Sequence, residues 1–253
     1  MKIADVYTEV QAYAPVALAE HWDHVGLLVG RPEAEVSRVL CALDITREVI
    51  EEAAAWGAQM IIAHHPLFFG GLPTLTPGEF SRENALLLAE NGIAGICMHT
   101  NLDATEGGVN DALTQALGLA QVERLSANGC SRVGCAEVKS VKSYAAHCKA
   151  ALGCGVVRFF DAGRPVSKVA IASGSGWDNF PDVLRCGADT FVTGDVKHSS
   201  FLEARHHGVN VLDCGHFATE NVVFPPLMAY LSEKFPALEI KLSAVQGEPY
   251  QCL

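Results

Sequence analysis

Basic residues are scarce in this sequence. Among 253 residues there are 18 Lys and Arg against 29 Asp and Glu, which gives a formal net charge of −11. A surface with this excess of negative charge disfavours non-specific binding to nucleic acid and to anionic membranes. The longest basic cluster, residues 204–208, is too short to form a basic patch. We therefore expect neither nucleic acid nor a membrane surface as a partner.

Long apolar runs and paired-cysteine motifs are also missing. No run approaches the ~18 apolar residues of a membrane span, and the first 15 residues show no apolar core of a secretory signal. The nine cysteines are odd in number and include no C-x-x-C pair, a pattern typical of reduced intracellular proteins rather than of disulfide frameworks. These absences together predict a cytoplasmic protein.

Short apolar runs of strand type recur along the chain. They are nearly continuous rather than alternating, which is typical of sheets that are covered on both faces. The expected strands are 37–44, 58–65, 93–99, 155–161, 168–174, 189–195 and 209–215.

Segments with helical patterns separate these strands. The expected helices are 46–57, 81–92, 107–118, 140–153, 177–187 and 199–208. The first has a start signal at Thr46 and a stop signal at Gly57. Repeated alternation of strand and helix predicts an α/β fold with largely parallel or mixed sheets.

Two parts of the chain resemble each other. Residues 39–65 align with residues 169–195 at a constant offset of 130, so that Val39 meets Val169 and Gly57 meets Gly187. This pattern predicts two related α/β lobes. We place them at residues 1–125 and 126–253, since 126–134 has the polar and glycine-containing composition of a boundary.

Polar residues follow four of the expected strands. The carboxyl ends of parallel strands are where functional groups collect in α/β sheets. The ligand-type residues of the four groups are His64 and His65, then His99 and Asp103, then Asp195 and His198, and finally His216 and Glu220. These are metal-ligand residue types at the place where ligands are expected.

Each group also has a purely structural interpretation. A single histidine at a strand end is commonly held by hydrogen bonds, and Asp103 could cap a helix that begins at 104. His216 and Glu220 are four residues apart, so they could form a local pair on one helix face. His206 and His207 are expected at a solvated helix end.

The groups taken together favour a metal centre. His64 and His65 are adjacent, and adjacent side chains of a strand point to opposite faces, so the pair suits two neighbouring ions better than one. Histidine ligands from two parts of the chain, combined with two carboxylate ligands, suit Zn²⁺, Fe²⁺, Mn²⁺ or Ni²⁺. Such ions would keep open coordination positions for water. In such paired sites the ions lie about 3.5–4 Å apart.

Four blocks of the sequence resemble the NGG-one-interacting-factor-three-like family of dinuclear metal-binding proteins. The blocks are 19-AEHWDHVGLLVG-30, 64-HHP-66, 99-HTNLD-103, and the pair 193-TGDVKHSSFLEA-204 with 214-CGHFATE-220. The family often has Asn where this chain has His24. The resemblance implies two α/β lobes with the metal site in the cleft between them, and toroidal homohexamers. It implies two divalent metal ions per chain and the ligands His64, His65, Asp103, His216 and Glu220.

The same resemblance implies a function. Many bacterial members are named GTP cyclohydrolase I type 2 homologues, which implies a metal-dependent hydrolase that directs hydroxide to C8 of a purine nucleotide. His99 and His198 would then be the catalytic acid–base residues. No glycine-rich phosphate loop is visible in the sequence. A non-catalytic metal-binding chaperone or regulatory scaffold is the alternative function.

Overall fold

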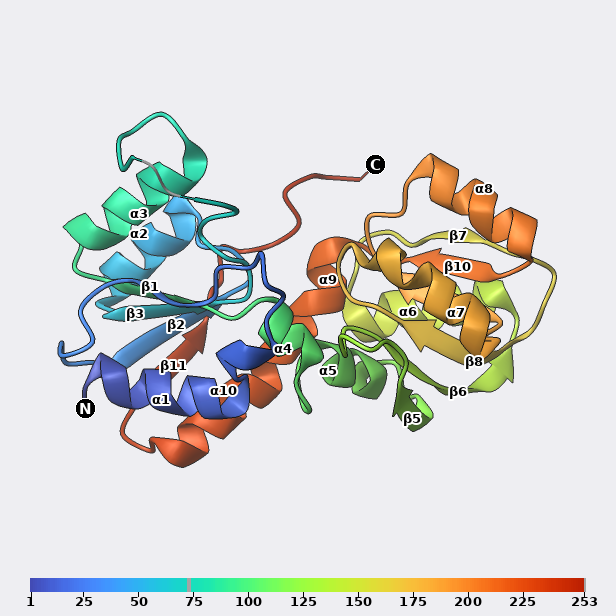
Figure 1. Cartoon of the computed structure of the whole chain (residues 1–253), viewed down its shortest axis with the longest axis horizontal. Coiled ribbons are helices and arrows are strands. Elements are labelled where there is room, and N and C mark those ends of the chain that lie inside the picture. Colours follow the sequence, from blue (N-terminus) through green and yellow to red (C-terminus); the bar gives the residue numbers. More distant parts are fainter. Residues whose placement is uncertain (72–73, 253) are drawn as a thin grey trace. The chain divides into compact units, whose positions relative to one another are not determined.

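The computed structural model describes residues 1–71 and 74–252, which form two compact units (Figure 1). The first unit comprises Met1–Thr105 and Phe224–Gly247. The second comprises Glu106–Val223 and the tail from Glu248 onwards. This division differs from the expected boundary at 125/126. Residues 106–125 pack with the second unit. Residues 224–247 return to the first unit, where they supply one strand of its sheet and one helix.

The first unit contains a five-stranded sheet in the order β1-β4-β3-β2-β11. β4, β3, β2 and β11 run parallel to one another, and β1 pairs with β4 antiparallel. The strands are β1 (Gly26–Val29), β2 (Arg38–Ala42), β3 (Met60–Ala63), β4 (Ala94–Cys97) and β11 (Glu239–Leu242).

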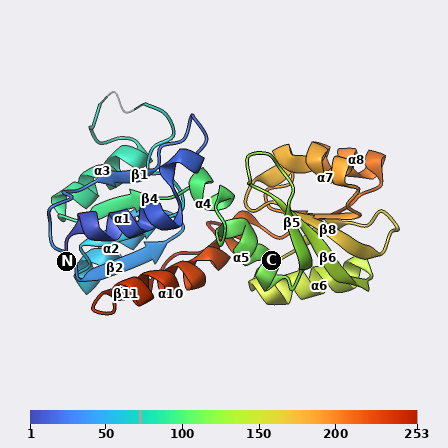
Figure 2. The ribbon, with the colours of Figure 1, turned by 60° about the horizontal axis from the view of Figure 1, so that its bottom comes forward.

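Helices cover both faces of this sheet. α2 (Arg47–Trp56) and α3 (Phe80–Glu90) lie on one face, and α1 (Ile3–Tyr13) and α10 (Phe224–Lys234) lie on the other (Figures 1 and 2). The predicted start and stop of α2 are confirmed. Thr46 accepts a hydrogen bond from the backbone N–H of Val49, and Gly57 takes the left-handed conformation at φ 75°.

The second unit contains a six-stranded sheet in the order β5-β6-β8-β9-β10-β7. β8, β9 and β10 are parallel, while β5, β6 and β7 pair antiparallel with their neighbours. The strands are β5 (Ala120–Arg124), β6 (Arg132–Lys139), β7 (Arg158–Phe160), β8 (Val166–Ile171), β9 (Thr190–Thr193) and β10 (Asn210–Asp213).

The core of the second unit lies on both faces of its sheet. Val169 and Ile171 pack in a cluster with residues of α5 (Val109–Ala116) and α6 (Val141–Leu152). Ala170 points the opposite way, into a cluster with residues of α7 (Phe180–Cys186) and α8 (His198–His207). This two-sided burial explains why the strands have nearly continuous apolar sequences.

The two units share a strand topology. The series β1-β4-β3-β2 in the first unit has the same order and directions as β7-β10-β9-β8 in the second. Gly57 and Gly187, which align in the sequence, both end a helix in the left-handed conformation. The topology therefore supports the internal relationship that the 130-residue offset indicates. Within the described residues, no helix has the length and apolar content that a membrane crossing requires.

Candidate metal centre

Three histidines converge at the carboxyl ends of β3 and β4 in the first unit. β3 ends at Ala63, so His64 and His65 stand just beyond it, and His99 follows β4. Each of the three offers a ring nitrogen that lies within 4.8 Å of the others. Because the chain has left the strand at these positions, the alternation of strand side chains does not separate His64 from His65.

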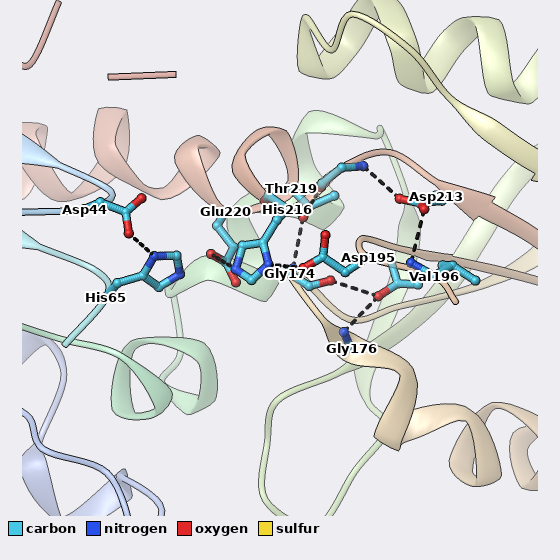
Figure 3. Close-up of polar contacts among 12 residues, drawn as sticks. Asp44, His65, Gly174, Gly176, Asp195, Val196, Asp213, His216, Thr219 and Glu220 are labelled. Carbon is cyan, nitrogen blue, oxygen red and sulfur yellow. Dashed lines mark hydrogen bonds and ion pairs between the residues drawn. The ribbon is translucent and has the colours of Figure 1, made fainter. Parts of the chain in front are cut away.

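Both histidines of the doublet are oriented through Nδ1. Nδ1 of His64 lies 2.8 Å from the carbonyl oxygen of Met98, and Nδ1 of His65 lies 2.7 Å from Oδ1 of Asp44 (Figure 3). A carbonyl oxygen only accepts, so Nδ1 of His64 carries the proton and Nε2 carries the lone pair. That Nε2 atom lies 3.7 Å from Oδ1 of Asp103, whose side chain is 13% exposed. Anchoring at Nδ1 is the usual arrangement of histidines that bind metals through Nε2.

His99 is held by a buried carboxylate. Its Nδ1 lies 3.0 Å from Oδ2 of Asp23, and the same oxygen accepts hydrogen bonds from the backbone N–H and hydroxyl of Thr100. Burial alone would raise the pKa of the Asp23 carboxyl, but the hydrogen bonds from His99 and Thr100 outweigh it and lower the pKa to about 2. Neighbouring His24 is exposed and donates its backbone N–H to Asp23.

The second unit presents its own donor pair. His216 and Glu220 lie one turn apart in α9 (His216–Glu220), which follows β10, and Nε2 of His216 is 3.0 Å from Oε2 of Glu220. On the other side of the ring, Nδ1 lies 2.7 Å from Oδ2 of Asp195 (Figure 3). Asp195 follows β9 and has a positive φ of 54°, which a non-glycine residue rarely adopts. His216 is thus oriented through Nδ1 in the same way as His65.

Gly174 keeps space open beside this pair. A Cβ atom at Gly174 would overlap with Oε1 of Glu220 and would lie 3.0 Å from Nε2 of His216. Hydrogen bonds fix the glycine: its N–H donates to the hydroxyl of Thr219 at 2.9 Å (Figure 3), and its carbonyl accepts from the backbone N–H groups of Gly194 at 2.8 Å and Gly176 at 3.0 Å. Only a residue without a side chain fits here, so the carboxylate of Glu220 keeps its position next to the imidazole.

The remaining candidates take different places. His198 is exposed and is the first residue of α8, while His206 and His207 lie at the other end of that helix, as expected. Asp103 lies inside α4 (Thr100–Ala104), and α5 begins at Val109 with Gly108 as its N-cap. The interpretation of Asp103 as a helix cap is therefore wrong.

The donors present suit a borderline divalent metal. His64, His65 and His216 each have Nδ1 held by an oxygen atom, and a carboxylate lies beside the Nε2 atom of His64 and of His216. Neutral imidazoles combined with carboxylates bind Zn²⁺, Fe²⁺, Mn²⁺ or Ni²⁺. Sequence reasoning missed the orienting role of two carboxylates: it did not single out Asp44, and it grouped Asp195 with His198 after a strand without giving it this role. The available signal was that each directly follows an apolar strand run.

Comparison with known proteins identifies the family. The family model described as Duf34/NIF3 (NGG1p interacting factor 3) matches residues 1–249. The chain belongs to this family. Among its Duf34/NIF3 relatives, a Clostridium perfringens protein is 34% identical over 99% of both chains. A Streptomyces coelicolor protein is 36% identical over 87% of this chain and 81% of the relative. Both relatives bear the name GTP cyclohydrolase 1 type 2 homolog.

Solved structures of other proteins share the fold. The Staphylococcus aureus hypothetical protein SA1388 matches with a TM-score of 0.92 at 30% identity, covering 100% of this chain and 99% of that one. Reduced HcgD from Methanocaldococcus jannaschii matches with a TM-score of 0.85 at 29% identity, covering 97% of this chain and 98% of that one. The resemblance found in the four sequence blocks is confirmed.

Proposed function

We propose that this protein is a metal-dependent hydrolase that acts on a purine nucleotide and uses two divalent ions per chain. The proposed ligands are His64, His65 and Asp103 from the first unit with His216 and Glu220 from the second. The observation that carries the proposal is the orientation of the three histidines. Each has Nδ1 fixed by a carbonyl or carboxylate oxygen, which leaves Nε2 as the ring atom that can bind a metal.

The orienting carboxylates support a binding role rather than a purely structural one. Asp44 and Asp195 each accept the Nδ1 proton of a proposed ligand, which increases the basicity of the ring and fixes its tautomer. Ions bound by these residues would supply Lewis acidity and lower the pKa of water to about 7.

Two histidines are proposed to transfer protons. Asp23 holds the Nδ1 atom of His99, so Nε2 is the atom that can accept a proton, and His99 lies among the proposed ligands His64 and His65. His198 is proposed for the same task from the second unit, because it lies three residues after Asp195 and is exposed to solvent. The conservative variants His99→Gln and His198→Gln separate the two, since the residue that transfers the proton lowers kcat with little change in KM when it is replaced.

The names of the relatives support the substrate class. The Clostridium perfringens and Streptomyces coelicolor relatives are named as homologues of a GTP cyclohydrolase, so GTP is the first substrate to test. The full chain is loaded with Zn²⁺, Fe²⁺, Mn²⁺ or Ni²⁺ in turn and incubated with GTP, and released formate is measured. Formate release that falls at least tenfold in His65→Ala, and not in the control His206→Ala, supports the proposal.

A fully metallated protein that releases no formate would contradict GTP cyclohydrolase activity. Turnover of a phosphoester panel by the same protein would then assign a different hydrolytic reaction to the same residues. Metal binding without any turnover would favour the alternative function, a metal-binding chaperone or regulatory scaffold.

We also propose that the chain assembles as a toroidal homohexamer, which rests on the family resemblance. Its location in the cytoplasm is proposed from the odd number of cysteines without a C-x-x-C pair. A mass of about six chains by light scattering supports this assembly, and a monomer mass over the whole concentration range would contradict it.

A further inference from the structure

Three cysteine thiols meet inside the second unit. Cys148 belongs to α6, Cys154 follows the same helix after its C-cap Gly153, and Cys214 directly follows β10. All three pack in one buried cluster, in which the Cys214 thiol lies beside both other thiols. The three residues are at most 7% exposed, and all are free thiols. The proposed function uses none of them.

A cavity gives small molecules access to two of the three. It has a volume of 540 Å³, and its lining includes Cys154 and Cys214 but not Cys148. Val156 and Tyr250, which also line the cavity, are 41% and 52% exposed, so the cavity reaches the surface of the unit. Solvent access therefore distinguishes Cys154 from Cys148 as the partner of Cys214.

The surroundings of Cys154 favour its thiolate. The hydrogen bond donated by Cys214 lowers the pKa of the Cys154 thiol to about 7, and it outweighs the effect of burial, which raises the pKa. The nearby Lys149 acts in the same direction as the hydrogen bond. The thiolate is the nucleophilic form of cysteine, so Cys154 has the reactive sulfur and Cys214 is placed to resolve it.

We propose that Cys154 and Cys214 form an oxidisable dithiol that reacts with hydrogen peroxide to give a reversible intramolecular disulfide. The Cys154 thiolate attacks one peroxide oxygen, the O–O bond breaks, and the released hydroxide takes up a proton to become water. The Cys214 sulfur then attacks the Cys154 sulfenic acid, the S–O bond breaks, the S–S bond forms, and a second water leaves with the thiol proton. Two thiols are oxidised to one disulfide, and one peroxide is reduced to two waters.

The bond would join two elements of the second unit. Cys154 lies in the loop after α6, and Cys214 lies two residues before His216. In a reducing compartment such a bond is transient and reports oxidation, in contrast to a structural disulfide. The proposal does not depend on metal binding, because the thiols and the cavity belong to the second unit alone.

Peptide mapping of the full chain tests the proposal directly. The reduced protein is treated with peroxide, the remaining thiols are alkylated, and trypsin is added. Cleavage at Lys149 separates Cys148 in peptide 143–149 from Cys154 in peptide 150–158, and Cys214 lies in peptide 206–234. We expect a linked pair of 150–158 with 206–234 that dithiothreitol separates, formed equally fast in the control Cys130→Ser.

A link from 143–149 to 206–234 in its place, or an unlinked peptide 150–158 after oxidation of other thiols, would overturn the proposal. A second variant checks the order of the steps. In Cys214→Ala the Cys154 sulfenic acid has lost its resolving thiol, so dimedone is expected to label peptide 150–158. Absence of this adduct, with the protein folded by circular dichroism, would also overturn the proposal.

Discussion

Nδ1 of His216 lies 2.7 Å from a carboxylate oxygen of Asp195, a residue whose backbone adopts a φ of 54°. The contact fixes the ring so that Nε2 faces Glu220. A left-handed backbone is uncommon at a non-glycine residue, and here it belongs to the residue that orients a proposed ligand.

Replacing Asp195 is therefore expected to weaken metal binding. Asp195→Ala removes the acceptor of the Nδ1 proton and should raise the metal dissociation constant about 10–100-fold, by titration with Zn²⁺. Asp195→Asn retains an uncharged acceptor, so its metal affinity should fall less than that of Asp195→Ala. The exposed Asp178, in the same unit, provides the control Asp178→Ala. Equal affinities in Asp195→Ala and Asp178→Ala would show that Asp195 does not orient a ligand.

Gly174→Ala is expected to disturb the same donor pair by contact. The new methyl group would overlap with the carboxylate of Glu220, so the side chain must move away from His216. Gly187→Ala is the matched control, because Gly187 also has a positive φ, of 70°, but its Cβ position meets no atom within 4 Å. Both variants should lose about 1–2 kcal/mol of unfolding free energy through backbone strain.

The metal affinity separates the two glycine variants. Only Gly174→Ala should bind Zn²⁺ at least tenfold more weakly than the wild-type chain. The same affinity in both variants would mean that the position of Glu220 is not critical for binding.

The Asp23 carboxyl predicts a dependence of stability on pH. Its pKa is about 2 in the folded chain against an ordinary value of 3.8, so the folded state binds the proton less readily. The stabilisation is complete above pH 4 and is lost as the pH falls through the folded pKa of about 2.

The variant Asp23→Asn measures this contribution. It should lower the unfolding free energy by about 1–3 kcal/mol at pH 7, since hydrogen bonds from His99 and Thr100 to a charged group are weakened. Urea unfolding of both proteins should show that the difference shrinks as the pH falls below 4. A difference that stays constant down to pH 3 would contradict the assignment.

Much of the α/β core could be predicted from the sequence. Apolar strand runs and helix caps are local signals, and they located β2, β3, β4 and the helices between them. β11 could not be predicted in the same way. Its pattern alternates between exposed and half-buried residues, and it joins the sheet by pairing with β2 roughly 200 positions earlier in the chain. β5 is exposed throughout, so it has no apolar pattern to reveal it.

Part of the candidate site could also be predicted from the sequence. His64, His65 and His99 stood out because histidines that end apolar strands are unusual, and the structure brings their ring nitrogens together. Asp44 did not stand out, and the orienting role of Asp195 was not predicted. A carboxylate after a strand is common, and its role depends on which ring nitrogen it contacts.

The most direct test of the central claim is the metal content of the purified full chain after growth in metal-replete medium. Inductively coupled plasma mass spectrometry should find about two divalent ions per chain in the wild type and in the control His206→Ala. His65→Ala and Glu220→Ala, from the two different units, should each lose metal. A wild-type chain that contains no divalent metal and binds none on titration would contradict the account, and so would full metal content in both ligand variants.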